Sequence, residues 1–174
     1  MRVFLIGFMG AGKSFLGKMW SEIHAIPFYD LDTLIEEEER KTVENIFEIF
    51  GENYFREREA AVLRNTDRFE NCIIACGGGT PCFFDNMHWM NKTGVTVFLN
   101  ETESNIFEHL NPDDKVRPLI SNQDEETLKL FIKNKIQSRI AFYNQSQLVL
   151  QSHQLNKESF LIISKYINEK EQPI

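Results

Sequence analysis

The stretch GFMGAGKS at residues 7–14 constrains the fold of this chain more than any other feature. It fits the pattern G-x-x-x-x-G-K-[ST], in which a glycine-rich loop wraps around a phosphate group. The run before it, Arg2–Ile6, is typical of a buried parallel strand, and the run after it, Lys13–Ile23, carries apolar residues at helical spacing. Because strand, loop and helix follow in the required order, we interpret residues 7–14 as a phosphate-binding P-loop rather than a turn without a ligand.

The chemistry of such a loop assigns roles to its residues. Backbone N–H groups at a helix N-terminus point at a bound anion, and the helix dipole adds partial positive charge there. We expect the Lys13 ammonium to reach the β- and γ-phosphates and the Ser14 hydroxyl to bind Mg²⁺. The backbone donors are those of Gly10, Ala11, Gly12 and Lys13. The ligand is therefore a nucleoside triphosphate, for which we expect ATP.

Composition narrows the class of protein further. With 174 residues, 42% of them hydrophobic, the chain has the length of one globular domain, 1–174. The net charge of −7 argues against nucleic acid as a partner, and no apolar run approaches the roughly 20 residues of a membrane span. The first expected strand begins at Arg2, which leaves no room for a signal peptide. We expect a cytoplasmic monomer whose cysteines are reduced and mostly buried, and whose four histidines form no ligand set.

Strands and helices alternate along the chain, which predicts an α/β fold. We expect a doubly wound sheet of about five parallel strands flanked by helices, of the P-loop NTPase type. The expected strands are Arg2–Ile6, a short one within Pro27–Asp32, one that begins at Cys72, Val95–Leu99 and Leu148–Leu150.

Several local expectations concern the segments between these strands. Two helices are expected, one before and one after Gly51, and a further helix is expected at Phe84–Met90. The acidic run Glu36–Glu39 is interpreted as a solvated helix face. The segment Asn111–Gln123 is polar and contains two prolines, so we interpret it as a lid or binding loop.

Two features follow the second and third strands, where ligands of open α/β sheets bind. Asp30 and Asp32 can divide labour, one holding Mg²⁺ through water and the other accepting a proton from a hydroxyl. Either aspartate can instead be the N-cap of the next helix. The glycines Gly77, Gly78 and Gly79 permit close approach to a small ligand, or they form a simple turn.

Three arginines stand in unusual settings. Arg56 is in helical register with Glu59, Arg117 is followed by a proline in the expected lid, and Arg139 lies near Tyr143. An arginine held by an acidic neighbour is suited to recognising a carboxylate. Spacing alone leaves open whether each of the three is functional or an ordinary surface residue.

Taken together, the motifs resemble those of the shikimate kinase family over nearly the whole chain. They are LIGFMGAGKS, FYDLD, IFEIFGENYFREREAAVL, IIACGGGTP, VRPLI and SRIAFYNQ. This family transfers the γ-phosphoryl group of ATP to the 3-hydroxyl of shikimate, in the pathway to chorismate and the aromatic amino acids. The resemblance implies a phosphotransferase that uses ATP, Mg²⁺ and shikimate.

The resemblance also implies roles for single residues. Lys13, Asp32 and Arg117 would be catalytic, with Asp32 as the base and Arg117 closing over the ATP phosphates. Ser14 would bind Mg²⁺ directly, with Asp30 close to the ion.

On the acceptor side, the resemblance implies that Arg56 and Arg139 grip the shikimate carboxylate and that Glu59 orients Arg56. The remaining substrate contacts would be the glycine segment Gly77, Gly78 and Gly79, with Phe47 and Phe55 as aromatic walls.

The chain also departs from the family pattern near the nucleotide. Phe15 stands where a threonine is common, which implies the loss of one hydroxyl contact to the α-phosphate. His109 or Leu110 stands where an arginine often binds adenine, and a later arginine is missing from SHQLNKES at residues 152–159.

Two other functions remain open on the residues alone. One is a P-loop kinase for another small molecule, such as gluconate or a nucleoside phosphate. The other is a nucleotide-binding switch without an acceptor, although NKTG at Asn91–Gly94 lacks the aspartate of a guanine-recognition motif.

Overall fold

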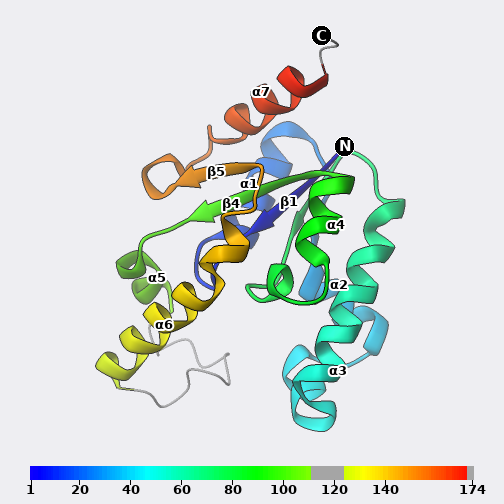
Figure 1. Cartoon of the computed structure of the whole chain (residues 1–174). Coiled ribbons are helices and arrows are strands. Elements are labelled where there is room, and N and C mark those ends of the chain that lie inside the picture. Colours follow the sequence, from blue (N-terminus) through cyan, green and yellow to red (C-terminus); the bar gives the residue numbers. More distant parts are fainter. Residues whose placement is uncertain (111–123, 172–174) are drawn as a thin grey trace.

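A computed structural model describes residues 1–110 and 124–171 of the chain (Figure 1). Its centre is a five-stranded sheet in the order β2-β3-β1-β4-β5, in which every pairing is parallel. The strands are β1 Arg2–Ile6, β2 Phe28–Asp30, β3 Cys72–Ala75, β4 Val95–Asn100 and β5 Leu148–Gln151. The predicted sheet of five parallel strands is confirmed.

Seven α-helices connect and flank the strands in the part of the chain that the structure describes. They are α1 Lys13–His24, α2 Leu31–Glu39, α3 Val43–Asn65, α4 Asn86–Thr93, α5 Glu103–His109, α6 Glu125–Tyr143 and α7 Phe160–Glu171. The helix α3 is kinked at Gly51, whose φ of 80° and ψ of 174° are not helical. The predicted break at Gly51 is therefore confirmed.

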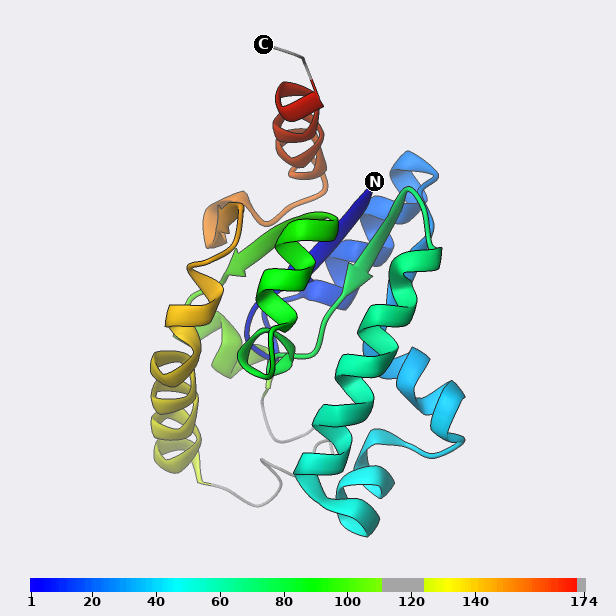
Figure 2. The same ribbon diagram turned by 45° about the vertical axis from the view of Figure 1, so that its right-hand side comes forward.

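Helices cover both faces of the sheet, as in a doubly wound fold (Figures 1 and 2). On one face, Leu16 and Trp20 of α1 and Phe160 of α7 pack against alternate strand residues such as Leu5 and Val97. On the other face, side chains of α2, α3, α4 and α6 pack against the remaining strand residues, which include Phe4, Ile74 and Phe98. This alternation arises because successive strand side chains point to opposite faces.

Two local expectations are corrected. The helix predicted to begin at Phe84 begins at Asn86, because Phe84 has a left-handed φ of 50° that interrupts a helix. The acidic run Glu36–Glu39 is not simply solvated. Glu39 accepts hydrogen bonds from Tyr54 and Arg58, and Glu38 pairs with Arg58, so this run ties α2 to α3.

The predicted lid, Asn111–Gln123, lies outside the described residues. Among the helices that the structure describes, none is long and apolar enough to span a membrane.

Candidate active site

The register of the sheet brings three loops together at one edge. Ala75, the last residue of β3, pairs with Leu5 of β1 and with Asp30 of β2. All three strands run in the same direction, so the loops that follow them leave from the same edge. These loops are the P-loop, the start of α2 and the glycine segment, which we define as residues 77–80. Ligands of open α/β sheets bind in this position.

The P-loop has the conformation that its sequence pattern requires. Gly12 is the N-cap of α1 with φ of 82°, a left-handed conformation that suits glycine. The Nζ atom of Lys13 lies 2.9 Å from the carbonyl oxygens of both Gly7 and Phe8. The lysine therefore bends back to the start of the loop, and its ammonium charge and the N-terminus of α1 both favour an anion bound there.

Asp30 is the N-cap of α2, one of the alternatives considered for it, and it also contacts the P-loop. Its Oδ1 atom accepts a hydrogen bond from the N–H of Asp32 at 3.1 Å and so caps α2, while its Oδ2 atom accepts from the Ser14 hydroxyl at 2.6 Å. A hydroxyl and a carboxylate thus lie side by side at the end of the P-loop. Such oxygen ligands suit Mg²⁺ when they share the ion with phosphate and water.

Asp32 has an unusual environment in the first turn of α2. Its Oδ1 atom is buried and has no hydrogen-bond partner among residues 1–110 and 124–171. Burial, followed by the charges of Asp30 and Glu59, raises the pKa of Asp32 to about 6, although Lys13 opposes the shift. Such a carboxylate is mostly ionised at neutral pH and can still accept a proton.

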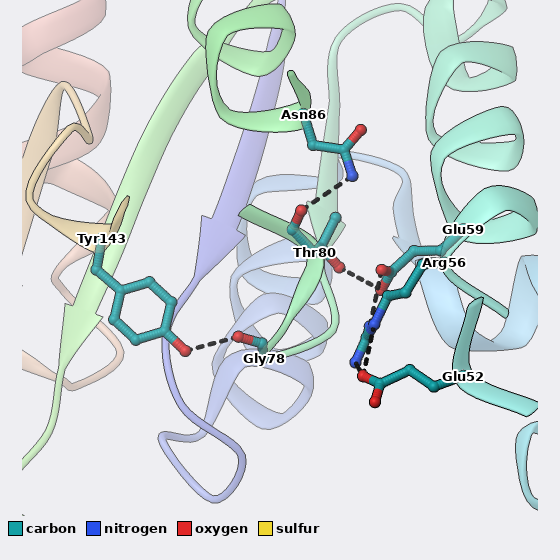
Figure 3. A network of polar contacts seen from close by, with 7 residues as sticks. All are labelled: Glu52, Arg56, Glu59, Gly78, Thr80, Asn86 and Tyr143. Atoms are coloured by element: carbon teal, nitrogen blue, oxygen red, sulfur yellow. Dashed lines mark hydrogen bonds and ion pairs between the residues drawn. The ribbon is translucent and has the colours of Figure 1, made fainter. Parts of the chain in front are cut away.

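Arg56 is held from several sides on α3. Its Nη1 atom lies 2.9 Å from Oε2 of Glu59, and its Nη2 atom lies 3.0 Å from Oε1 of Glu52 (Figure 3). The guanidinium also lies 5.0 Å from the ring centre of Phe55 and 5.9 Å from that of Phe47. The two carboxylates and the aromatic rings hold the guanidinium in one orientation.

Arg139 reaches the same region from α6. Its guanidinium lies 5.7 Å from the ring centre of Phe8, which belongs to the P-loop. Among the described residues, no carboxylate pairs with Arg139 within 4.0 Å. The charge of Arg139 is therefore available for an anionic ligand, whereas that of Arg56 is partly neutralised by Glu59.

The glycine segment lies between these two arginines. A Cβ atom on Gly78 would lie 3.3 Å from Nη1 of Arg139 and 3.2 Å from the N atom of Met9. A Cβ atom on Gly79 would lie 2.7 Å from Nη2 of Arg56. A side chain at Gly79 would displace the Arg56 guanidinium, and one at Gly78 would press on the P-loop backbone and Arg139, so glycine suits both positions.

Several residues of the site were not identified from the sequence. The ring centre of Phe83 lies 4.4 Å from the Arg56 guanidinium, closer than that of Phe47 or Phe55. Tyr143 donates to Gly78, and Thr80, within the glycine segment, donates to Glu59. Cys82 is half-buried, and burial raises the pKa of its thiol although the charges of Arg139 and Arg56 oppose the shift, whereas Cys76 is fully buried. A buried aromatic or threonine carries no sequence signal that distinguishes it from core.

The structure also places the residues that depart from the family pattern near the nucleotide. Phe15 is 72% exposed beside the P-loop, Nδ1 of His109 lies 2.8 Å from the carbonyl oxygen of Gly10, and Leu110 is buried. Arg117 lies in the part of the chain that the structure does not describe. The described part holds no cluster of three or more His, Cys, Asp or Glu residues suited to a metal ion.

Comparison with known proteins gives consistent matches over nearly the whole chain. The profile of a family described as shikimate kinase matches residues 9–168. A shikimate kinase of Bacteroides thetaiotaomicron is 43% identical over 155 residues, which cover 89% of this chain and 89% of that protein. The crystal structure of shikimate kinase from Bacteroides thetaiotaomicron has a TM-score of 0.85 at 40% identity and covers 98% of this chain and 97% of that one. The structure of a shikimate kinase from Acinetobacter baumannii in complex with shikimate has a TM-score of 0.84 at 26% identity. The match covers 98% of this chain and 95% of that chain.

Proposed function

The chain belongs to the shikimate kinase family, and we propose that it transfers the γ-phosphoryl group of ATP to the 3-hydroxyl of shikimate at the carboxyl edge of its sheet. The observation that carries this proposal is the position of the glycine segment. Gly78 and Gly79 contact the P-loop backbone, Arg139 and Arg56 within one short stretch. A small acid held by both arginines therefore lies next to the phosphate position of the P-loop.

On the acceptor side, Arg56 and Arg139 bind the carboxylate of the acid and Asp32 receives the proton of the reacting hydroxyl. The hydroxyl oxygen forms a bond to the γ-phosphorus, and the bond from that phosphorus to the bridging oxygen of ADP breaks. The buried Oδ1 atom of Asp32 supports this role, since no residue in the described ranges 1–110 and 124–171 hydrogen-bonds to it and it can accept the proton directly. Phe47 and Phe55 would form the apolar wall of the same pocket.

On the donor side, the ammonium of Lys13 and the N–H groups at residues 10–14 hold the phosphates of ATP. Phosphoryl transfer depends mainly on such positioning and charge stabilisation. Ser14 and Asp30 offer the hydroxyl and carboxylate oxygens that suit Mg²⁺, which would neutralise phosphate charge when it is bound. The role of Arg117 as a further cation over the phosphates rests on the family resemblance.

We further propose a cytoplasmic monomer. The cysteines in the described residues are all free, as is usual in a reducing compartment. Light scattering at micromolar concentration measures the mass of the particle, and the mass of a dimer would contradict the monomer.

The test of the proposed function is ADP release with ATP, Mg²⁺ and shikimate. The same mixture without shikimate, and with gluconate in its place, provides the two controls. We expect ADP release that depends on shikimate, together with a product heavier by one phosphoryl group in mass spectrometry. Release that depends on gluconate would indicate a different small-molecule kinase. ATP binding without transfer to either acid would indicate a nucleotide switch.

A further inference from the structure

Two buried hydroxyl groups hold the glycine segment from opposite sides (Figure 3). The Tyr143 hydroxyl donates to the carbonyl oxygen of Gly78 at 2.6 Å. The Thr80 hydroxyl donates to Oε1 of Glu59, also at 2.6 Å. Tyr143, Thr80 and Glu59 are all 0% exposed. The Thr80 bond joins two buried groups and the Tyr143 bond reaches a partly buried carbonyl, and hydrogen bonds this short restrain the backbone of the segment.

Each of these two contacts comes from a helix that also carries an arginine of the acceptor site. On α3, Glu59 lies three residues after Arg56, and on α6, Tyr143 lies four residues after Arg139. Residues three or four apart lie on the same face of a helix. The same helical face therefore presents an arginine and, one turn away, a contact to the glycine segment.

The segment in turn limits where the arginines can lie. Gly78 is close to Arg139 and Gly79 is close to Arg56, so that a side chain at Gly79 would displace the Arg56 guanidinium. A shift of the backbone at residues 78–80 changes the space available to both guanidiniums. The segment thus acts as a spacer between two helices that approach it from either side.

A third contact reinforces the same segment. The Asn86 side chain donates to the carbonyl oxygen of Thr80 at 2.9 Å and accepts from Nη1 of Arg64, also at 2.9 Å. Thr80 is therefore held both by its hydroxyl and by its backbone carbonyl. Burial raises the pKa of Tyr143, so its phenol stays protonated and keeps donating at neutral pH.

We propose that Tyr143 and Thr80 are positioning residues for the acceptor arginines. Their hydroxyls hold the glycine segment at the spacing at which Arg56 and Arg139 converge on one carboxylate. The inference rests on the proposed function, because the carboxylate of the acceptor acid is what the two guanidiniums bind. Removing either hydroxyl should weaken binding of the acid without changing the donor site.

The test compares Tyr143→Phe and Thr80→Val with the unchanged protein. The first variant keeps the ring, which stacks on Phe98 at 5.0 Å between ring centres, and the second keeps the shape of the side chain. We expect the KM for shikimate to rise about tenfold in each variant, while the KM for ATP and kcat stay within about twofold. Thr80→Ser, which keeps a hydroxyl, should restore the KM.

Matched controls separate this effect from a general loss of hydrogen bonds. Tyr54→Phe removes a phenol that donates to Glu39, and Thr96→Val removes a buried hydroxyl that donates to the partly buried Asn91. Both controls lie outside the site, so the KM for shikimate should not change. Thermal unfolding of all variants measures their stability, and if Thr80→Val does not fold, Tyr143→Phe decides the outcome.

A second substrate provides a readout that a purely structural role would not affect. In the methyl ester of shikimate the charged carboxylate is absent, so the unchanged protein and Tyr143→Phe should process the ester equally slowly. An equal loss of kcat/KM on acid and ester would overturn the inference, as would an unchanged KM for shikimate in both variants. Absence of shikimate-dependent ADP release in the unchanged protein would instead contradict the proposed function itself.

Discussion

The two halves of the proposed site are built in different ways. The donor half is residues 7–14, and the acceptor half comprises Asp32, Arg56, the glycine segment and Arg139. In the donor half, Lys13 bonds to residues five and six positions earlier in the chain. In the acceptor half, the hydrogen bonds that hold the glycine segment join residues 21 and 65 positions apart. One half is a local structure, and the other is assembled by the packing of separate helices.

This difference indicates which substitutions should affect each half of the site. A local loop keeps its shape as long as β1 and α1 form, since its glycines supply the required backbone conformation. The acceptor half depends on the distance between α3 and α6, which many side chains determine together. We therefore expect substitutions in the acceptor half to weaken binding of the acid and to leave ATP binding unchanged.

The largest effect is expected for Asp32→Asn. Without a base, kcat should fall by about 10²–10⁴-fold, while ATP binding measured by calorimetry stays unchanged. A loss of ATP affinity by more than threefold would contradict the separation of the two halves.

The same substitution should stabilise the fold above pH 6. The pKa of Asp32 is about 6 in the folded protein, above the ordinary value of 3.8, so the folded state binds the proton more tightly. Stability therefore falls as the pH rises from about 4 to 6, and an amide removes that loss, which amounts to up to about 3 kcal/mol. Thermal unfolding at pH 8 measures the gain, and a lower Tm for the variant would contradict it.

Arg139→Ala should raise the KM for shikimate by about 10- to 100-fold, because a charged hydrogen-bond donor to the carboxylate is lost. The KM for ATP should not change. Lys135→Ala removes an exposed cation one turn earlier on α6 and is the matched control. An unchanged KM for shikimate in Arg139→Ala would remove this residue from the acceptor site.

The rate should also depend on pH through Asp32. Below pH 6 the protonated carboxyl cannot accept a proton, so kcat/KM should fall about tenfold for each pH unit, and above pH 7 it should level off. ATP binding measured at the same pH values accounts for titration of the nucleotide. A profile that is flat from pH 5 to 8 would show that Asp32 is not the base.

The smallest effect is expected on the donor side, for Phe15→Thr. A hydroxyl at this exposed position can bond to the α-phosphate, so the KM for ATP should fall about two- to fivefold while the KM for shikimate stays constant. Phe15→Ala tests whether removal of the ring alone has the same effect. If the alanine variant matches the threonine variant, the hydroxyl makes no contact.

Much of the fold could be predicted from local patterns. The apolar run Arg2–Ile6, the alternation of strands and helices and the break at Gly51 are short-range signals, and the structure confirms them. The errors arose where distant residues decide the outcome. Glu39 accepts hydrogen bonds from Tyr54 and Arg58, which lie 15 and 19 residues away in the chain. Phe84 has a left-handed conformation that no local pattern indicated.

The sequence by itself determined the sheet and the position of the P-loop, because strand periodicity, glycine conformation and helical spacing depend on neighbours a few residues apart. The candidate residues of the acceptor site followed from the resemblance to the shikimate kinase family. Only the tertiary structure decided that Asp32 has a buried oxygen without a partner among the described residues, that Phe83 packs on Arg56 and that Tyr143 holds Gly78. Burial, electrostatic environment and contacts between helices depend on residues far apart in the chain, and the packing of α3 and α6 around the sheet brings them together.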